Sequence, residues 1–533
     1  MSIDLELEEF ILFSQTIDGK KKEGGVMKKK RLLISIFLGV LAVILMNSLA
    51  MSEPVSLFGR PGNIMGYITQ GGSFSLLDKD KYDVEKNFNS ALMNLYLEGD
   101  YSPIDRLKFY ASGMLTVDWI YQLKHNDSSW NDKLFNKSHD RLNVDDKYWQ
   151  LLKEAHFTWT PENAMLRVGK QTVSWGEMMA FRVMDQINPL DQRRGMADVE
   201  FETSIIPIWL VRAEYYLPTK PAWLQDLGFE FIWNPNADFI PNQGGKVGND
   251  AGGIWAPNIQ LPGPPPFWEM HLGSTFDSIR TPTRWKEGNE FAFRAKGIVK
   301  DTVITLNAFY GRDNDPVTLP QPFPPLITIA SDGRAILHPF QEGKYPLFRF
   351  VGATVSRDIP PLKASFLGGV APTVFFETFY AFKDTFTFSD PITGMARFDK
   401  SDEFRGAGAI NWKVKVPILN PHTFFSLMGE FYWRRIMDYP SFEVIQGLKK
   451  NNYMTFLSAS TSYLHNKLTP SIAWMYDINS KSGMFRPQLV YDHSNNWHFT
   501  LGATILHGDK RNQGLQIFDN KDQIYFKVSY KWG

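Results

Sequence analysis

The chain has 533 residues, and its 57 Lys and Arg balance 57 Asp and Glu, so the formal net charge is zero. There is no general basic field that would attract nucleic acid, and no nucleic-acid partner is expected. The sequence contains no cysteine, which excludes disulfides, thiolate zinc sites, cysteine nucleophiles, iron–sulfur clusters and covalently attached haem. Aromatic residues make up 14% of the chain although its mean hydropathy is only -0.26. Apolar residues are therefore spread along the chain rather than collected in blocks.

One continuous apolar block, residues 32–46, follows the basic run 27–31 and precedes small residues at Ser48 and Ala50. A basic segment, an apolar segment and small residues before a cleavage point form a secretory signal peptide, so residues 27–50 are expected to be removed after Ala50. A signal anchor is the alternative, because the block nearly reaches the thickness of a bilayer. Residues 1–26 hold six acidic residues and three lysines, which is the wrong sign for the start of a signal peptide. We therefore expect Met27 to be the true start and residues 1–26 to be a mis-assigned extension.

From residue 51 onward, apolar and polar residues alternate in short segments. The last segment places Ile524, Phe526 and Val528 on one face and Lys527 and Ser529 on the other. Alternation with a period of two predicts β-strands that have one apolar and one polar face. Eighteen candidate strands begin near residues 65, 89, 106, 152, 165, 206, 227, 290, 302, 347, 372, 403, 422, 452, 468, 484, 496 and 522.

The connections between these strands alternate between short and long. Tight turns are expected at residues 100–105, 161–164, 299–301, 465–467 and 493–496, and long connections at 119–150, 175–205, 234–289, 312–346, 383–402, 435–451 and 508–521. A transmembrane β-barrel has this pattern, with short periplasmic turns and long outer loops. The predicted fold is therefore all-β, a transmembrane antiparallel barrel over residues 51–533 with about 18 strands. Sixteen strands would fit if the weak segments near residues 227 and 372 are not strands.

A soluble all-β protein would show the same alternation, with the apolar face turned to a core. Tryptophans at strand ends favour the barrel, because aromatic residues gather at the two membrane interfaces. These residues are Trp119, Trp159, Trp175, Trp209, Trp233, Trp412, Trp433 and Trp532. A connection as long as residues 234–289 would also be unusual in a compact soluble domain.

Three short motifs lie between residues 155 and 217. They are Gly169-Lys170-Gln171 at a strand end, Trp175-Gly176-Glu177, and Asn188-Pro189-Leu190-Asp191. This stretch resembles a porin-like outer-membrane family of Gram-negative bacteria that is catalogued as a domain of unknown function. In this chain Lys170 stands where that family usually has an arginine. The resemblance implies an outer-membrane barrel and no known substrate. The alternating C-terminal strand also resembles the signal by which the barrel assembly machinery of the outer membrane recognises its clients, except that Gly533 follows the terminal aromatic Trp532.

An 18-stranded barrel is too wide for side chains to fill, so its interior is a polar channel or is plugged. The first strand begins close to the predicted cleavage site, which leaves no room for a plug domain, so an in-folding loop is expected to set the bore. The third outer loop, residues 176–204, is rich in charge and has an apolar flank. Its resemblance to the third loop of general porins, which bends into the barrel, favours this interpretation over a loop solvated at the surface. The residues expected in the constriction are Glu177, Arg182, Asp185, Asp191, Arg193, Arg194, Asp198 and Glu200.

Alternation also assigns charges to the wall of the lumen. The cations are Arg167, Arg212, Arg294, Lys296, Arg349, Arg405, Lys413, Arg434 and Arg486, and the opposing acids are Glu98, Asp118, Glu154, Glu214, Glu377, Glu430 and Asp492. A basic wall that faces an acidic loop would focus a transverse field and favour polar or anionic solutes. The alternative is that these charges only pair with one another.

The predicted function is an outer-membrane, porin-like channel for passive uptake or exchange of small-molecule solutes. A channel for hydrophobic compounds is one alternative, since the Pro-rich run 261–268 could capture them, and a structural or adhesive barrel is another. No enzyme motif is present: there is no Gly-x-Ser-x-Gly elbow, no zinc-protease motif and no calcium loop. No cofactor is expected, the expected partner besides the solute and the assembly machinery is outer-membrane lipid, and the oligomeric state stays open.

Overall fold

The computed structural model describes residues 55–57, 59–76, 88–123, 144–145, 151–191, 204–219, 221–235, 260–262, 269–272, 276–280, 282, 285–321, 324–329, 335–390, 392, 395–445, 447–510, 513–519 and 521–532. All of them belong to the unit Ser52–Gly533. The predicted extension and signal peptide, residues 1–50, lie outside the described residues.

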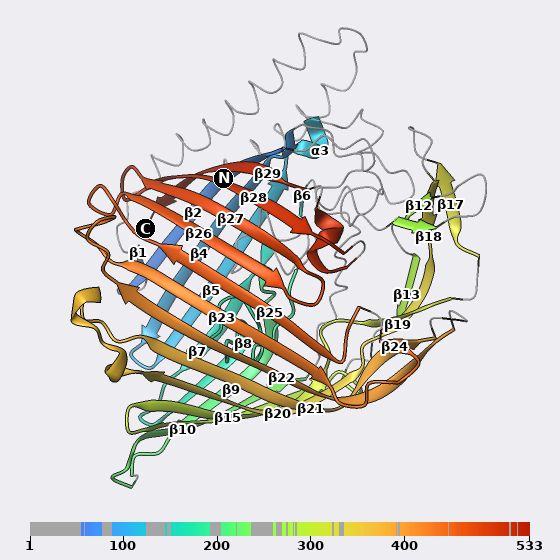
Figure 1. Cartoon of the computed structure of the whole chain (residues 1–533). Helices are drawn as coiled ribbons and strands as arrows, with labels where there is room; N and C mark the ends of the chain where they lie inside the picture. The colour runs from blue at the N-terminus through green and yellow to red at the C-terminus, as the bar shows by residue number, and fades with distance from the viewer. Residues whose placement is uncertain are drawn as a thin grey trace, which may run out of the picture. The chain divides into compact units, whose positions relative to one another are not determined.

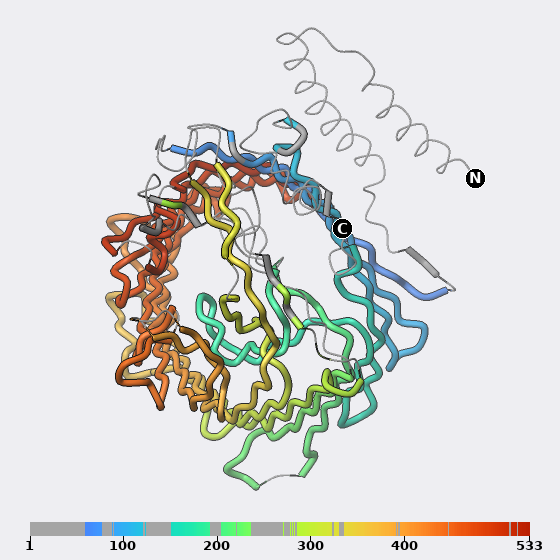
Figure 2. The backbone as a smooth tube through the Cα atoms, turned by 90° about the vertical axis from the view of Figure 1, so that its right-hand side faces the viewer, coloured from blue at the N-terminus to red at the C-terminus, as the bar shows by residue number. Residues whose placement is uncertain are grey.

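Eighteen long strands form a closed antiparallel ring in the described part of the chain (Figures 1 and 2). In order around the ring they are β2 (Arg60–Ser75), β4 (Leu92–Ile104), β5 (Leu107–Asp118), β7 (Glu154–Trp159), β8 (Ala164–Gln171), β9 (Ile208–Tyr216), β10 (Leu224–Asn234), β14 (Glu290–Val299), β15 (Thr302–Arg312), β20 (Leu347–Asp358), β21 (Thr373–Ser389), β22 (Ala396–Val414), β23 (Phe425–Ile436), β25 (Asn451–Ser460), β26 (Leu468–Asp477), β27 (Ser482–Asp492), β28 (Trp497–Gly508) and β29 (Gln523–Trp532). The ring closes where β29 pairs with β2, from Gly66 opposite Trp532 to Ser75 opposite Gln523. The predicted barrel of 18 strands is confirmed, and the two weak segments are β10 and β21.

Short elements complete the described structure. Four short strands pair with strands of the ring: β1 (Val55–Leu57) and β3 (Phe88–Ser90) pair with β2, β6 (Val144–Asp145) with β5, and β24 (Val444–Ile445) with β21. There are also two small sheets in the described structure. The first contains β11 (Gln260–Pro262), β12 (Glu269–Leu272), β18 (Ala335–His338) and β17 (Leu326–Ile329). The second contains β13 (Phe276–Arg280), β19 (Phe340–Lys344) and β16 (Val317–Pro320). The helical turns are α3 (Ile120–Leu123), η2 (Pro360–Leu362), η3 (Ser365–Leu367) and η4 (Gly514–Phe518). No helix within the described residues has the length and apolar character needed to cross a membrane.

The barrel turns an apolar face outward and a mostly polar face inward. On β29, Phe526 is 40% exposed on the outside, whereas the neighbouring Tyr525 is 2% exposed on the inside. Leu306, Leu457 and Leu501 are likewise exposed on the outside of their strands. An exposed apolar surface around a closed sheet is stable in lipid rather than in water. The alternation that the sequence predicts for the last strand is therefore present in the fold.

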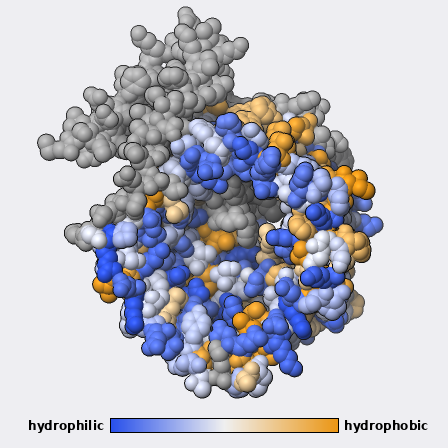
Figure 3. All heavy atoms as spheres, turned by 90° about the vertical axis from the view of Figure 1, so that its left-hand side faces the viewer, coloured by the Kyte–Doolittle hydropathy of each residue, from blue (hydrophilic) through white to orange (hydrophobic). Residues whose placement is uncertain are grey.

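The two ends of the barrel differ. At one end, which we call the turn end, β4 joins β5, β7 joins β8 and β14 joins β15 through short turns, and β2 starts and β29 finishes there. Figure 3 shows this end from outside, where mainly hydrophilic residues surround a central hollow. At the opposite end, the loop end, most connections are long. Two connections at the loop end correct the predicted strict alternation. The predicted long connection 383–402 is mostly strand, because β21 continues to Ser389 and pairs with β22 from Ala396 onward. Residues 478–481 are a tight turn, because the Asp477 carboxylate accepts the N–H groups of Asn479 and Ser480 at 2.8 and 3.2 Å.

Candidate functional site

Residues 172–191, here called the inner segment, leave β8 at the loop end and run inside the ring of strands (Figure 2). The segment is folded by its own side chains. Asp185 Oδ1 accepts hydrogen bonds from the N–H groups of Trp175 and Gly176, at 2.6 and 2.9 Å. Asn188 accepts the N–H of Val173 at 2.8 Å and donates to the carbonyl of Ile206 at 3.0 Å, which joins the two ends of the connection.

The motifs that carry the family resemblance all serve this arrangement. Gly169 has a φ of +136°, and a Cβ at that position would lie 2.2 Å from the carbonyl oxygen of Ala155, so only glycine fits there. The next residue, Lys170, is fully buried and donates to the carbonyl of Leu152. Trp175, Gly176 and Asn188 take part in the hydrogen bonds that fold the inner segment. The motifs therefore have a structural explanation in the turn from the wall into the lumen.

Two glutamates of the barrel wall fasten the inner segment. Glu377, on β21, accepts hydrogen bonds from the N–H groups of Glu177, Met178 and Met184, the latter two at 3.1 Å each. Glu430, on β23, accepts those of Met179, Ala180 and Phe181 at 2.7, 3.0 and 3.3 Å.

Each carboxylate therefore satisfies three backbone donors in residues 177–184, a stretch that lies outside the strands. Backbone N–H groups need a partner once they are removed from water, and bonds to a charged acceptor are the stronger kind. The polar side of the inner segment is bound to the wall by these six bonds.

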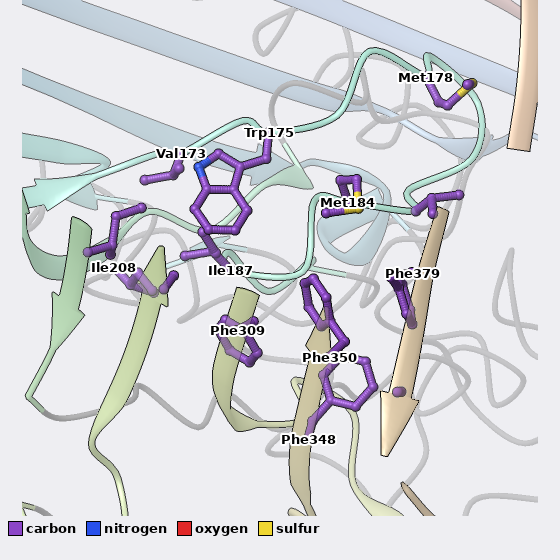
Figure 4. Close-up of a cluster of buried hydrophobic side chains, with 14 of the residues drawn as sticks. Val173, Trp175, Met178, Met184, Ile187, Ile208, Phe309, Phe348, Phe350 and Phe379 are labelled. Carbon is purple, nitrogen blue, oxygen red and sulfur yellow. The ribbon is translucent and has the colours of Figure 1, made fainter. Parts of the chain in front are cut away.

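An apolar cluster lies on the other side of the inner segment (Figure 4). Trp175, Val183 and Met184 are almost completely buried against aromatic side chains from the lumen face of the wall. The wall side chains are Phe309 on β15, Phe348 and Phe350 on β20, and Phe379 on β21. The rings of Phe350 and Phe379 are stacked, with centroids 4.7 Å apart. Burial of this area favours the packed position, since apolar side chains gain about 1.5–3 kcal/mol each when fully removed from water.

Trp175 also reaches a charged group of the wall. Its indole Nε1 donates to Glu230 Oε2 at 3.1 Å, and Glu230 lies 2.7 Å from Arg212 Nε and 3.9 Å from Arg294 Nη1. Trp175 is 1% exposed. The prediction that Trp175 belongs to an interfacial girdle is therefore wrong, whereas Trp159, Trp209 and Trp233 are exposed on the outer face, as that prediction requires.

The charged residues predicted for the constriction occupy different positions. Glu177 is exposed, whereas Asp185 is used inside the segment. Arg182 donates from Nη2 to the carbonyl of Asn188 at 2.9 Å, and its burial lowers the pKa of the guanidinium. Asp191 pairs with Ser204 through its backbone N–H at 2.7 Å. Arg193, Arg194, Asp198 and Glu200 lie outside the described residues.

Four of the nine cations predicted for the lumen wall, Arg212, Arg294, Arg405 and Arg434, form ion pairs with acids in the described structure. Arg212 lies 2.6 Å from Glu214 in addition to its contact with Glu230. Arg405 binds Glu403, which also holds Arg434 at 2.5 Å. Paired charges of this kind cancel much of the field that a basic wall would produce.

The remaining cations of that wall have neutral partners or none among the contacts described. Arg167 donates from Nε to Thr158 at 2.9 Å, and Arg486 donates from Nε to the Tyr525 hydroxyl at 3.1 Å. Lys296 is exposed on the same face of β14 as the buried Arg294.

Arg349 requires a correction. Its neighbours Phe348 and Phe350 point into the lumen, where they are 2% and 1% exposed, so Arg349 belongs to the outer face of β20. Its cross-strand partner Tyr310 is 47% exposed on that face. The predicted lumen position of Arg349 is wrong because it rests on the rule that apolar residues face outward. On β20 the apolar Phe348 and Phe350 face inward instead, where the inner segment covers them.

The roles of Glu377 and Glu430 were not predicted, although both were assigned to the lumen. A signal does exist in the sequence. Each is a single carboxylate within an apolar and aromatic strand, TVFFETFYA for Glu377 and FSLMGEFYW for Glu430. A lone carboxylate in such surroundings is costly unless donors satisfy it. Among the described residues, no group of three or more His, Asp or Glu could hold a metal ion.

Comparisons with known proteins give similarity without a described activity. No curated protein matches the chain. The solved structures that it resembles include a BenF-like porin from Pseudomonas fluorescens, with 8% identity, 90% of this chain and 100% of that chain covered, and a TM-score of 0.46. Acinetobacter baumannii OccAB1 shares 11% identity, with 88% and 96% covered and a TM-score of 0.43. Salmonella typhi OmpF in complex with daunomycin shares 10% identity, with 89% and 98% covered and a TM-score of 0.35.

The sequence itself matches one family over part of its length. The motifs between residues 155 and 217 lie within that part, so the predicted resemblance is confirmed. Residues 70–245, which include β4, β5 and β7 to β10, match the model of the family described as "Protein of unknown function (DUF1302)".

Proposed function

We propose that this protein is an outer-membrane channel for the passive movement of small polar solutes, with the inner segment narrowing its bore. The observation that carries the proposal is the set of six hydrogen bonds from the inner segment to Glu377 and Glu430 on the inside of the barrel wall. A ring of 18 strands is wide enough for an aqueous interior, and a segment fixed inside it reduces the open cross-section.

The path proposed for solutes runs beside the inner segment rather than through it. The segment packs on the lumen faces of β10, β14, β15 and β20 to β23, through the aromatic cluster and the two glutamates. The opposite wall, from β26 through β29 and β2 to β8, supplies polar lumen groups such as Arg486, Tyr525, Tyr96, Glu98 and Arg167. Solutes would pass between this polar wall and the inner segment.

The alternative functions find less support. A path for hydrophobic compounds needs apolar surface open to the bore, but Phe348, Phe350 and Phe379 are covered by the inner segment. A purely structural or adhesive barrel gives no reason for a segment held inside the lumen. The proposal does not include catalysis. Export through a signal peptide, insertion by the outer-membrane assembly machinery through β29 and contact with outer-membrane lipid are parts of the proposal.

Conductance in planar bilayers tests the proposed function. We expect the purified protein to form open channels, and a variant that lacks residues 178–197 to fold and to show a larger single-channel conductance. A wild-type protein that inserts but does not conduct would contradict the channel. Equal conductance of wild type and deletion variant would contradict the constriction, and the fold of both proteins is checked by circular dichroism.

A further inference from the structure

A cavity of about 460 Å³ opens on the inner face of β5, β7 and β8, close to the turn end. Its lining includes Lys108, Tyr110, Glu154, His156, Thr158 and Arg167. Lys108 and Tyr110 alternate along β5 with Phe109, and His156 and Thr158 alternate along β7 with Phe157. Phe109 and Phe157 are exposed on the outer face, so the cavity belongs to the lumen.

The charges around this cavity are not balanced from within. Three cations, Arg106, Lys108 and Arg167, face two acids. Lys108 is already paired with Asp100, which lies outside the lining, with Nζ 3.4 Å from Oδ2. Asp105 is already paired with Arg60, which lies outside the set of lining residues, at 2.5 Å. This pairing lowers the pKa of Asp105. The other acid, Glu154, accepts the N–H of Thr172 at 2.6 Å. Lys108 and Asp105 are thus paired from outside the lining, and the cations that remain beside Glu154 are Arg106 and Arg167.

Arg167 is the best placed cation. Its Nε donates to Thr158 Oγ1 at 2.9 Å, which fixes the plane of the guanidinium, and the structure shows no ion pair for Arg167 in the described part of the chain. The adjacent Arg212, its cross-strand partner, already uses Glu214 and Glu230. A guanidinium held at Nε still offers its two terminal nitrogens, and this fork matches the two oxygens of a carboxylate.

The cavity also offers apolar contact beside its cations. The rings of Tyr110 and His156 are stacked, with centroids 5.2 Å apart and planes 24° from parallel. The hydroxyl of Tyr110 donates to Glu98, which orients the tyrosine ring. Leu107 lies in the same lining. An inorganic oxyanion makes no apolar contact with these surfaces, whereas the carbon skeleton of an organic acid can pack against them.

We propose that this cavity binds a small organic acid, with its carboxylate on Arg167 and its carbon skeleton against Tyr110 and His156. This inference rests on the proposed channel, since a solute reaches the cavity only through the lumen. The site would raise the local concentration of organic anions along the path and give the channel a preference within the broad class of polar solutes.

Titration calorimetry of the detergent-solubilised protein with sodium phenylacetate tests the site independently of conduction. We expect saturable binding to the wild type, at least tenfold weaker binding to Arg167→Gln, and a smaller loss for Lys108→Gln. The neutral analogue 2-phenylethanol and inorganic phosphate should both bind at least tenfold more weakly than phenylacetate. Arg167→Lys keeps the charge without the fork and should lie between wild type and Arg167→Gln, which also keeps the test open if Arg167→Gln does not fold.

Lys413→Gln is the matched control, because Lys413 is a cation on the lumen face of β22 near the turn end and outside the cavity. Its affinity for phenylacetate should stay within twofold of wild type. Equal losses at Lys413 and Arg167 would show a general field in place of a site, and equal binding of phosphate would remove the organic part of the inference. Conduction without phenylacetate binding would overturn the site alone, whereas phenylacetate binding without conduction would overturn the channel alone.

Discussion

Replacing Glu430 by alanine should release the middle of the inner segment from the barrel wall. The carboxylate accepts three backbone N–H groups, those of Met179, Ala180 and Phe181. A hydrogen bond to a charged group contributes about 1.5 kcal/mol at the low end, so three contribute about 4.5 kcal/mol. Because the three bonds share one acceptor, their effects are not additive, and we expect a loss of about 3 to 4.5 kcal/mol in local stability. At about 1.4 kcal/mol for each factor of ten, the open form becomes about a hundredfold to a thousandfold more populated.

Hydrogen exchange measured by mass spectrometry detects this change directly, because exchange of a protected N–H follows the population of the open form. Peptides that contain residues 179–181 should exchange faster in Glu430→Ala, while those from β26 to β29 should not change. Glu98→Gln is the control, since Glu98 is also a lumen acid but binds the hydroxyls of Tyr96 and Tyr110 instead of the segment. Unchanged exchange at residues 179–181 in Glu430→Ala would refute the idea that the wall carboxylates hold the segment.

Three further outcomes are expected. Phe526→Arg, on the outer face, should lower the free energy of unfolding by about 2 to 4 kcal/mol in a refolding titration in lipid if the site lies near the bilayer midplane. Ser529→Arg, on the inner face, should lower it much less, and equal losses would contradict the assignment of the two faces. Trp175→Ala should cost about 3 to 5 kcal/mol in the local stability of the inner segment by opening a cavity, measured as faster hydrogen exchange of residues 173–176, and wild-type exchange rates would contradict the buried position. Burial and the nearby Asp315 raise the pKa of Asp313 to about 6, so folding takes up a proton there and the stability that it contributes is lost as the pH rises from about 4 to about 6. Asp313→Asn should remove this part of the pH dependence of the urea midpoint, and an unchanged dependence would show that another group causes it.

The strands could be predicted because their signal is local. Residues such as Ile524 and Phe526 face lipid and Lys527 faces the lumen, so the period of two appears directly in the sequence. Lipid on one side and water on the other impose the same rule on each strand. The 18 predicted starting positions therefore agree with the structure within a few residues for most strands, and the largest difference occurs at β22, whose first residue is Ala396.

The fastening of the inner segment could not be predicted in the same way. Glu377 and the N–H of Glu177 are 200 residues apart, and Glu430 lies 251 residues from Met179. Nothing local in either stretch specifies the other. Arg349 was misplaced for a related reason, since Phe348 and Phe350 face inward only because Met184 and Trp175 of a distant segment cover them. The position of one loop thus reverses the rule that apolar side chains point outward.

The closure of the barrel by β2 and β29 has a consequence for how the molecule is made. Thr69 and Ser529, which share a hydrogen bond at 2.7 Å, are 460 residues apart in the sequence. Until the last ten residues of the ring are in place, both β2 and β28 carry an unpaired edge, and such edges pair readily with other chains. Closing so long a loop is also slow, because its entropy is lost before the final ladder forms. The chain therefore remains an open sheet until β29 pairs with β2. Folding without aggregation depends on protecting the free edges of β2 and β28 during that time.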